Sequence, residues 1–333
     1  MNSIQSFSRR DFLKTAIAGV AAGSAFIANS QEKKEGEVPT RILGRTGERV
    51  SAIGLGGWTI GRVEEKNAIS IMHEAIDAGV TFFDNCWEYH DGWAEELMGK
   101  ALATQGRRDK VYLMSKGCGR DADNAESQIN DSLRRLDTDH MDLWLFHGVS
   151  IKEEIPRMLD DQKGALAAVL KAQKAGKIRH IGFSCHSPTD VALEILSSGF
   201  QFDSALIPLS ILDAHFDSYQ HKVLPILNEQ NVGVLGMKSL SVGSIPSLGF
   251  DPKQARRYSL SLPISSLMCG IQSRDNLLQD LDMARNFIPM TEADVKPLLE
   301  KSANFAKEGK YERYKTSTVA GCRWQYEQDQ ASA

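Results

Sequence analysis

The sequence alternates eight times between a short apolar run and a longer segment with helical spacing of its apolar residues, and this repeat constrains the fold most. The apolar runs lie at residues 51–55, 81–83, 111–114, 141–146, 178–183, 204–207, 232–235 and 266–270. The helical segments lie at residues 68–78, 94–103, 125–136, 166–175, 191–197, 223–230 and, most weakly, 253–260. Strand–helix units repeated eight times, roughly every thirty residues, are typical of an α/β protein of the (β/α)8 TIM-barrel type.

An open, doubly wound parallel sheet is the alternative arrangement for such alternation. That fold places a Gly-x-Gly-x-x-Gly turn after its first strand, where the chain approaches a pyrophosphate. Here the first apolar run is followed by Gly56 and Gly57, and the next glycine, Gly61, does not complete that spacing. The sequence therefore favours the closed barrel.

The barrel is expected to span residues 39–290, with additional elements at both ends. Residues 41–44 and 49–56 are extended runs around a short turn, which predicts a β-hairpin before the barrel. Residues 291–333 begin with a helix at about 292–307 and continue as a polar tail. We therefore expect a C-terminal helical extension.

The first thirty residues have the three-part pattern of an export signal. Arg9 and Arg10 precede an apolar stretch at residues 15–28, and small residues then offer a cleavage site. The paired arginines resemble a twin-arginine signal, which implies export by the twin-arginine machinery and a periplasmic location. Residues 1–30 would be the signal and residues 31–38 a polar linker. The apolar stretch is too short to span a bilayer, so no stable membrane anchor is expected; the alternative is an amphipathic first helix of the domain.

Charge and cysteine content argue against several functional classes. Lys and Arg number 39 and Asp and Glu number 43, for a net charge of −4 without a basic block, so no nucleic-acid partner is expected. The five cysteines, Cys86, Cys118, Cys185, Cys269 and Cys322, include no Cys-x-x-Cys pair. Such scattered cysteines predict reduced thiols rather than a disulfide framework. Four of them lie near predicted strand ends, which leaves a metal cluster as an alternative, but their spacing is not that of a metal site.

Four polar residues lie at or just beyond the carboxyl ends of consecutive predicted strands. Asp84 ends the second strand, and Tyr89 lies in the loop beyond it. Lys116 ends the third strand and His147 the fourth. The carboxyl ends of barrel strands face the active site, so we expect all four side chains in one place. Singly, each is more often structural: a helix cap, a packed ring or a buried histidine.

Together, these residues fit the reduction of a carbonyl group. A hydride that reaches the carbonyl carbon leaves an alkoxide, which needs a proton, and Tyr89 is the candidate donor. A phenol pKa of about 10 is high for this task. An ammonium about 4 Å away contributes roughly 4 kcal/mol at an effective dielectric constant of about 20, so Lys116 is expected to lower that pKa. Asp84 would keep Lys116 charged, and His147 would orient the substrate oxygen.

Several motifs, in order along the chain, resemble the aldo-keto reductase family over about residues 40–287. They are Leu-Gly-Arg-Thr-Gly at 43–47, Gly-Leu-Gly-Gly at 54–57, Phe-Phe-Asp-Asn-Cys at 82–86, Glu-Glu-Leu-Met-Gly-Lys-Ala-Leu at 95–102, Leu-Arg-Arg-Leu at 133–136, Asp-Leu-Trp-Leu-Phe-His at 142–147 and Gly-Lys-Ile-Arg-His-Ile-Gly-Phe-Ser at 176–184. The resemblance implies hydride transfer with a nicotinamide dinucleotide and without a metal. It also implies that Tyr89 is the acid, that Lys116 and Asp84 tune it, and that His147 orients the carbonyl group.

The resemblance also implies a set of cofactor-binding residues. They are Gly57, Trp58, Asp84, Ser184, Met237, Lys238, Ser239, Leu240, Gln272, Ser273, Arg274, Gln279 and Asp280. The chain departs from the family pattern at Cys185 and Leu206, which replace the Asn and Gln that hold the nicotinamide amide. Asn276 replaces the Arg that binds a 2′-phosphate. The cofactor is expected to be NADP or NAD, with NADP favoured because Arg274 or Lys238 can compensate.

The substrate is expected to be a small carbonyl compound or a sugar. Trp58 and Trp87 follow strand ends and offer an aromatic pocket, which suits a sugar ring or an aryl carbonyl. Residues 182–186 resemble a subgroup with an iron–sulfur cluster on cysteine-rich C-terminal loops, but Cys322 is the one cysteine there, so no cluster is expected. The alternative functions are an exported binding barrel with weak or no turnover, and a metal-dependent isomerase or hydrolase, which needs more carboxylates and histidines at strand ends.

Overall fold

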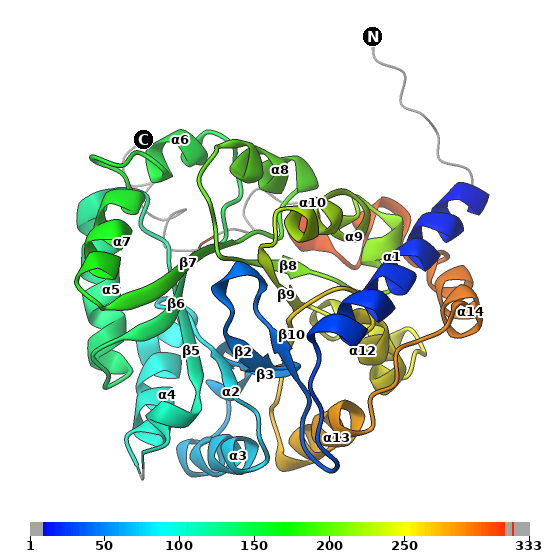
Figure 1. The fold of residues 1–333 in the computed structure, drawn as a ribbon, viewed down its shortest axis with the longest axis horizontal. Coiled ribbons are helices and arrows are strands. Elements are labelled where there is room, and N and C mark those ends of the chain that lie inside the picture. The colour runs from blue at the N-terminus through cyan, green and yellow to red at the C-terminus, as the bar shows by residue number, and fades with distance from the viewer. Residues whose placement is uncertain (1–8, 105, 317–321, 323–333) are drawn as a thin grey trace.

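The structure is a computed structural model that describes residues 9–104, 106–316 and 322. The first eight residues of the predicted export signal and most of the predicted C-terminal tail lie outside these ranges. Within them, the chain forms a closed barrel of eight parallel strands surrounded by helices (Figure 1). The predicted α/β fold of the (β/α)8 TIM-barrel type is confirmed.

Neighbouring strands pair in parallel around the barrel in the order β10, β3, β4, β5, β6, β7, β8, β9. Their bounds are β3 (Ile53–Gly56), β4 (Phe82–Asp84), β5 (Tyr112–Gly117), β6 (Met141–Phe146), β7 (Ile178–Ser184), β8 (Ser204–Pro208), β9 (Gly233–Met237) and β10 (Ser266–Cys269). Each strand overlaps one of the predicted apolar runs. Such runs arise because barrel strands are buried on both faces, by the interior and by the helices outside.

Helices cover the outside of the barrel (Figure 1). The longer ones are α3 (Glu65–Asp77), α4 (Trp93–Leu102), α5 (Ala122–Arg135), α7 (Ala165–Lys174), α8 (Thr189–Ser197), α10 (Leu224–Glu229), α12 (Pro252–Leu260), α13 (Arg274–Arg285) and α14 (Glu292–Ser302). Shorter turns are α2 (Gly57–Ile60), α6 (Glu154–Met158), α9 (Tyr219–Lys222), α11 (Ser244–Ser247), η1 (Gly44–Thr46), η2 (Tyr89–Gly92), η3 (Arg108–Lys110), η4 (Asp213–His215), η5 (Ser241–Gly243), η6 (Lys307–Gly309) and η7 (Arg313–Lys315). Local chemistry sets the helix starts: at α5, Asp121 accepts a hydrogen bond from the Asn124 backbone N–H at 3.0 Å.

Alternate residues of each strand point into the barrel, and this alternation positions the candidate site. Phe82, Met114 and Leu145 belong to the apolar cluster that fills the barrel interior. Residues two positions farther along a strand point to the same side of the sheet. Those residues are Asp84, Lys116 and His147, at or just past the carboxyl ends of β4, β5 and β6.

A two-stranded hairpin lies against the amino end of the barrel, as predicted. Its strands, β1 (Thr40–Ile42) and β2 (Arg49–Ser51), pair antiparallel. Leu43 and Val50 are fully buried and join the interior cluster. Gly44 lies so close to the start of β9 that a Cβ there would come within 2.2 Å of the Gly233 backbone nitrogen. The hairpin therefore closes this end of the barrel.

One helix, α1 (Arg9–Ser30), precedes the hairpin and packs against α14 and α9 (Figure 1). Val20 and Ile27 are buried. Gly23 lies so close to the domain that a Cβ there would come within 1.9 Å of the Ser261 carbonyl oxygen. In this structure the segment predicted to be a signal is also packed as a first helix of the domain. In the described part of the chain, no helix combines the length and hydropathy needed to cross a membrane.

Candidate active site

The four predicted catalytic side chains meet at the carboxyl end of the barrel, and Lys116 lies at their centre. Its Nζ forms an ion pair with Asp84 and donates to the Asn85 carbonyl oxygen at 2.6 Å. The same nitrogen donates to Tyr89 Oη at 3.3 Å. The Tyr89 and His147 rings meet edge to face, with 5.7 Å between their centroids. A carboxylate, an ammonium, a phenol and an imidazole thus share one site.

Backbone contacts hold the loop after β4 in the place that brings Tyr89 to Lys116. The Asn85 N–H donates to the Met114 carbonyl oxygen at 2.8 Å, and the Trp87 N–H donates to the Lys116 carbonyl oxygen at 2.9 Å. The two residues after Tyr89 have positive φ angles of 54° and 57°, a left-handed conformation that turns the chain sharply into α4. The backbone hydrogen bonds between β4 and β5 therefore continue into the loop that carries Tyr89.

Burial dominates the electrostatics of this site. Burial lowers the pKa of Lys116, but the charge of Asp84 outweighs it, so the net pKa is raised and Lys116 stays protonated. Burial raises the pKa of Tyr89, and Lys116 offsets only part of that rise. Lys116 acts in the expected direction, but the net pKa of Tyr89 is raised, because the expectation left out the cost of burying the phenolate. Burial also lowers the pKa of His147, whose ring is therefore neutral at neutral pH.

Several side chains surround one ring nitrogen of His147, and the sequence had offered a cluster of strand-end cysteines only as an alternative. Its Nδ1 lies 3.3 Å from Cys86 Sγ and 3.5 Å from Cys118 Sγ. Cys322 Sγ lies 3.3 Å and Glu88 Oε1 3.1 Å from the same nitrogen. Cys86 and Cys118 each follow a predicted catalytic residue by two positions, so the alternation of the strands was a signal for them. No local pattern places Cys322 beside them.

Cys118 and Cys322 form a disulfide between residues 204 positions apart, with 5.9 Å between their Cα atoms. The prediction that all cysteines are reduced is therefore wrong for this pair. The reason is that Cys322 lies beside Cys118 at the carboxyl end of the barrel, a long-range contact that cysteine spacing does not reveal. In the described part of the chain, Cys86, Cys185 and Cys269 are buried free thiols.

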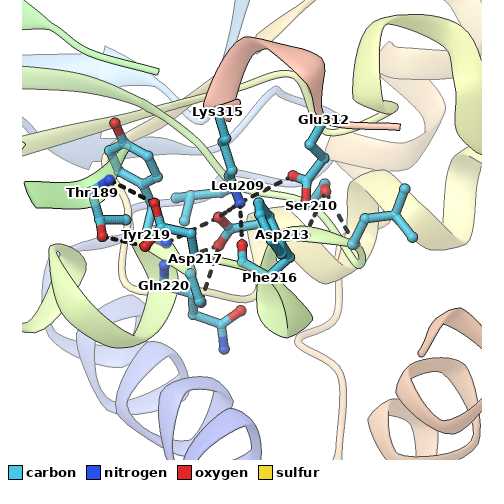
Figure 2. Close-up of polar contacts among 12 residues, drawn as sticks. Thr189, Leu209, Ser210, Asp213, Phe216, Asp217, Tyr219, Gln220, Glu312 and Lys315 are labelled. Carbon is cyan, nitrogen blue, oxygen red and sulfur yellow. Dashed lines mark hydrogen bonds and ion pairs between the residues drawn. The ribbon is translucent and has the colours of Figure 1, made fainter. Parts of the chain in front are cut away.

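A buried ion cluster of Lys315, Asp213 and Glu312 lies at η7, the last helical turn of the described chain before Cys322 (Figure 2). The Lys315 Nζ donates to Asp213 Oδ1 at 2.6 Å and to the Phe216 carbonyl oxygen at 2.8 Å, and it lies 3.2 Å from Glu312 Oε1. Asp213 also accepts hydrogen bonds, each 3.0 Å long, from two backbone N–H groups at the start of α9. This Lys315 cluster fastens η7 to η4 and α9.

Most of the predicted cofactor residues gather at three neighbouring strand ends. Gly57 and Trp58 follow β3, residues 237–240 end and follow β9, and residues 272–274 follow β10, which pairs with both strands. Ser184 ends β7, and its Oγ accepts a hydrogen bond from the Gly148 backbone N–H at 2.9 Å. The ends of β9, β10 and β3 are therefore neighbours, and the end of β7 is separated from them by β8.

Three predicted cofactor residues have other surroundings. Asp280 is buried on α13 in an ion pair with Arg256. Gln279, beside it on the same helix, is exposed. Arg274 donates two hydrogen bonds, of 2.8 Å and 2.7 Å, to the carboxylate of Glu74 on α3. A ligand phosphate would have to compete with that carboxylate for Arg274.

Lys238 is the cation that best fits an anionic ligand. In the described part of the chain, the Lys238 Nζ lies over the Tyr314 ring, 5.2 Å from its centroid, and 3.6 Å from Met237 Sδ. Neither of these two neighbours carries a negative charge. Burial, together with the nearby charge of Lys116, lowers the pKa of Lys238 to about 8. A phosphate group beside this ammonium would restore its charge.

Similarity to known proteins points to one family. Residues 52–266 match the Aldo/keto reductase family. An L-galactose dehydrogenase of Arabidopsis thaliana is 27% identical over 227 residues, which cover 64% of this chain and 69% of that protein. A 6-dehydroglucose reductase of Novosphingobium aromaticivorans is 34% identical over 172 residues, covering 46% and 53%. The solved holo form of an aldo-keto reductase from Bacillus halodurans has a TM-score of 0.67 at 24% identity, covering 82% of this chain and 99% of that one.

The barrel and these similarities define the class of protein as an NAD(P)-dependent oxidoreductase. The chain belongs to the aldo/keto reductase family, so the resemblance found in its motifs is confirmed. Proteins of this family use NAD(P)H, and the match does not separate NADP from NAD.

Proposed function

We propose that the protein moves a hydride between a nicotinamide dinucleotide and the carbonyl or alcohol carbon of a small substrate, with Tyr89 as general acid and base. The observation that carries this proposal is the position of Lys116 Nζ, which contacts Asp84, the Asn85 carbonyl oxygen and Tyr89 Oη at once. This arrangement keeps a charged ammonium beside a phenol at the end of the barrel where substrates bind.

In the direction of reduction, Tyr89 gives its proton to the oxygen that becomes an alcohol. Its raised pKa ensures that this proton is present at neutral pH. Lys116, 3.3 Å from the phenol oxygen, stabilises the phenolate that remains by about 5 kcal/mol at an effective dielectric constant of about 20. The neutral ring of His147 donates a hydrogen bond to the substrate oxygen and orients it. The dinucleotide, when bound, supplies or accepts the hydride.

For the cofactor we propose NADP in preference to NAD. Lys238, after β9, supports this preference. Arg274, after β10, would contribute only if a phosphate replaced the Glu74 carboxylate that it now binds. Lys238 is partly buried beside uncharged neighbours, and burial lowers its pKa, which is the environment that an added phosphate compensates. Residues 237–240 and 272–274 would hold the dinucleotide along these strand ends, and Gly57, Trp58 and Ser184 would flank it.

For the substrate we propose a sugar or a related polyol. The Trp58 ring is 46% exposed, lies 5.3 Å from the Tyr89 ring and stacks on His90 with 4.7 Å between centroids. The Arg62 guanidinium also lies over this ring, 5.1 Å from its centroid. A partly exposed aromatic side chain next to the proton donor can pack against the C–H groups of a sugar ring. The names of two relatives, an L-galactose dehydrogenase and a 6-dehydroglucose reductase, support the same class.

The experiment compares Tyr89→Phe with Tyr112→Phe. Tyr89→Phe is expected to bind dinucleotide normally and to lower turnover by about 10²- to 10⁴-fold, the usual contribution of a positioned acid. Tyr112 is a matched control, because its hydroxyl is buried in the barrel without a hydrogen-bond partner in the described structure. Full carbonyl reduction by Tyr89→Phe would exclude Tyr89 as the acid. A wild-type protein that binds dinucleotide without turning over sugars would favour a binding protein instead.

We also propose that the chain is exported through the twin-arginine machinery to the periplasm with its dinucleotide already bound. Arg9 and Arg10 ahead of an apolar stretch support export. Free dinucleotide is expected to be scarce there, so the cofactor would be recycled in place, with residues 239–251 covering it. Replacing both arginines with Lys should keep the protein in the cytoplasm. Protein from the exported fraction should release about one dinucleotide per chain on denaturation, and an empty site would contradict the proposal.

A further inference from the structure

Three cysteine sulfurs and one carboxylate surround a single imidazole nitrogen beside the catalytic group. The ligand atoms of Cys86, Glu88, Cys118 and His147 all lie within 4.8 Å of one another. Cys322 reaches the same point from the C-terminal end of the chain, 3.3 Å from His147 Nδ1. All three cysteines are buried. The group therefore combines side chains from the ends of β4, β5 and β6 with one from the C-terminal segment.

Hydrogen bonding does not explain this arrangement. An imidazole nitrogen has one lone pair or one N–H, so it makes one good hydrogen bond and not three. A tetrahedral ion with metal–sulfur bonds of about 2.3 Å and metal–nitrogen bonds of about 2.0 Å separates sulfur from nitrogen by about 3.5 Å. The three sulfurs lie 3.3, 3.5 and 3.3 Å from His147 Nδ1. These separations match the edges of such a tetrahedron.

We propose that the reduced protein binds one Zn²⁺ through the thiolates of Cys86, Cys118 and Cys322 and Nδ1 of His147. Three thiolates and one imidazole form a ligand set typical of zinc sites with four protein ligands. Glu88, whose Oε1 lies 3.1 Å from the same nitrogen, is a neighbouring carboxylate at the edge of the site. The Cys118–Cys322 disulfide is the oxidised, metal-free alternative, because a disulfide sulfur is not a thiolate ligand.

Two buried cations, Arg120 and Lys116, lie close to the proposed ligands and favour a net negative charge there. Three thiolates and Zn²⁺ leave one net negative charge. Arg120 donates to the carbonyl oxygens of Cys118 at 3.0 Å and His147 at 2.8 Å, so its charge lies beside the ligands. Lys116 is the second cation. Its carbonyl oxygen lies 3.5 Å from Cys86 Sγ, and its side-chain ammonium belongs to the adjoining catalytic group. Burial raises the pKa of the Cys86 thiol, and the charge of Lys116 offsets part of that rise. A bound Zn²⁺ would offset the rest, because the metal binds the thiolate and not the thiol.

A metal on Nδ1 also sets the role of His147 in the proposed carbonyl chemistry. An imidazole that binds a metal through one nitrogen keeps its proton on the other. His147 would then present Nε2–H as a fixed donor to the substrate oxygen, and the ion would act as a positioning group. This consequence rests on the proposed function, whereas metal binding itself does not depend on turnover.

The test uses Co²⁺ as a spectroscopic probe of the full chain. The protein is first treated with a phosphine, which converts the Cys118–Cys322 disulfide to two thiols and becomes the phosphine oxide by taking oxygen from water. Co²⁺ added without oxygen is expected to bind at about one ion per chain, with intense visible bands of a tetrahedral site and a thiolate charge-transfer band. Zn²⁺ should displace it. Reduced, folded wild-type protein that binds neither ion would overturn the proposal.

Matched cysteine variants locate the site. Cys86→Ser, Cys118→Ser and Cys322→Ser are each expected to weaken binding by more than about 100-fold, beyond the effect of losing a group that only supports a ligand. Cys185→Ser and Cys269→Ser remove other buried thiols and should bind Co²⁺ as the wild type does. Circular dichroism checks that each variant is folded. Unchanged Co²⁺ spectra in Cys118→Ser and Cys322→Ser would refute the assignment.

A further variant separates this proposal from the proposed function. Tyr89→Phe leaves every proposed ligand in place, so it should bind Co²⁺ normally while its turnover falls. If the reduced wild-type protein turns over carbonyl substrates but does not bind Co²⁺, the metal site alone is refuted. Normal Co²⁺ binding with full turnover in Tyr89→Phe would refute the acid assignment alone.

Discussion

Replacing Lys315 with Met keeps the length of the side chain but removes the ammonium shared by Asp213 and Glu312. Burial raises the pKa of Glu312 to about 7, so without Lys315 this carboxyl takes up a proton. Asp213 is fully buried, and its carboxyl group would lose the ammonium that contacts it. Removing one partner of a buried ion pair costs about 3–5 kcal/mol. For 333 residues the entropy of unfolding is roughly 0.7 kcal/mol/K, so the melting temperature should fall by about 4–7 °C.

The assay is thermal unfolding of Lys315→Met followed by circular dichroism. Lys307→Met is the control, because Lys307 is an exposed lysine in the same segment, and it should change the free energy of unfolding by less than about 0.5 kcal/mol. Adding Asp213→Asn to Lys315→Met removes the carboxyl group that has lost its ammonium and should recover part of the loss. A Lys315→Met protein that melts at the wild-type temperature would refute the reasoning that this cluster fastens the C-terminal segment.

Two further predictions concern pH. Burial, with the charge of Lys116, lowers the pKa of Lys238 to about 8, so dinucleotide affinity should be constant below that pH and decline above it. Fluorescence titration should show this decline in the wild type and not in Lys238→Met; a wild-type affinity unchanged at about pH 9 would contradict it. Burial lowers the pKa of His215 to about 4, so the unfolded chain takes up this proton first. The contribution of neutral His215 to the free energy of unfolding is fully present above about pH 6.5 and is lost as the pH falls toward 4. The expected loss between about pH 7 and pH 5 is about 2 kcal/mol. Urea unfolding at both values should show a smaller loss in His215→Gln, and equal losses would exclude His215 as the cause.

The sequence by itself determined the barrel and the strand ends of its candidate site. Apolar runs that recur roughly every thirty residues suffice to predict eight parallel strands, because each strand is buried on both faces and each helix on one. The period of two along a strand then places Asp84 in the same inward direction as Phe82, and Lys116 in the same direction as Met114. The same alternation extends to Cys86 and Cys118, although the sequence analysis did not use it there.

The tertiary structure alone decided what surrounds those side chains. The pKa of Tyr89 rises instead of falling because the barrel buries the phenol, and burial is a property of the assembled fold. Cys322 meets Cys118 across 204 residues, and Lys315 reaches Asp213 across 102. The segment that carries Cys322 and Lys315 has no period that points to a partner. Its place depends on where the chain arrives after α14, and contacts of that range follow from the packing of the whole barrel rather than from local sequence.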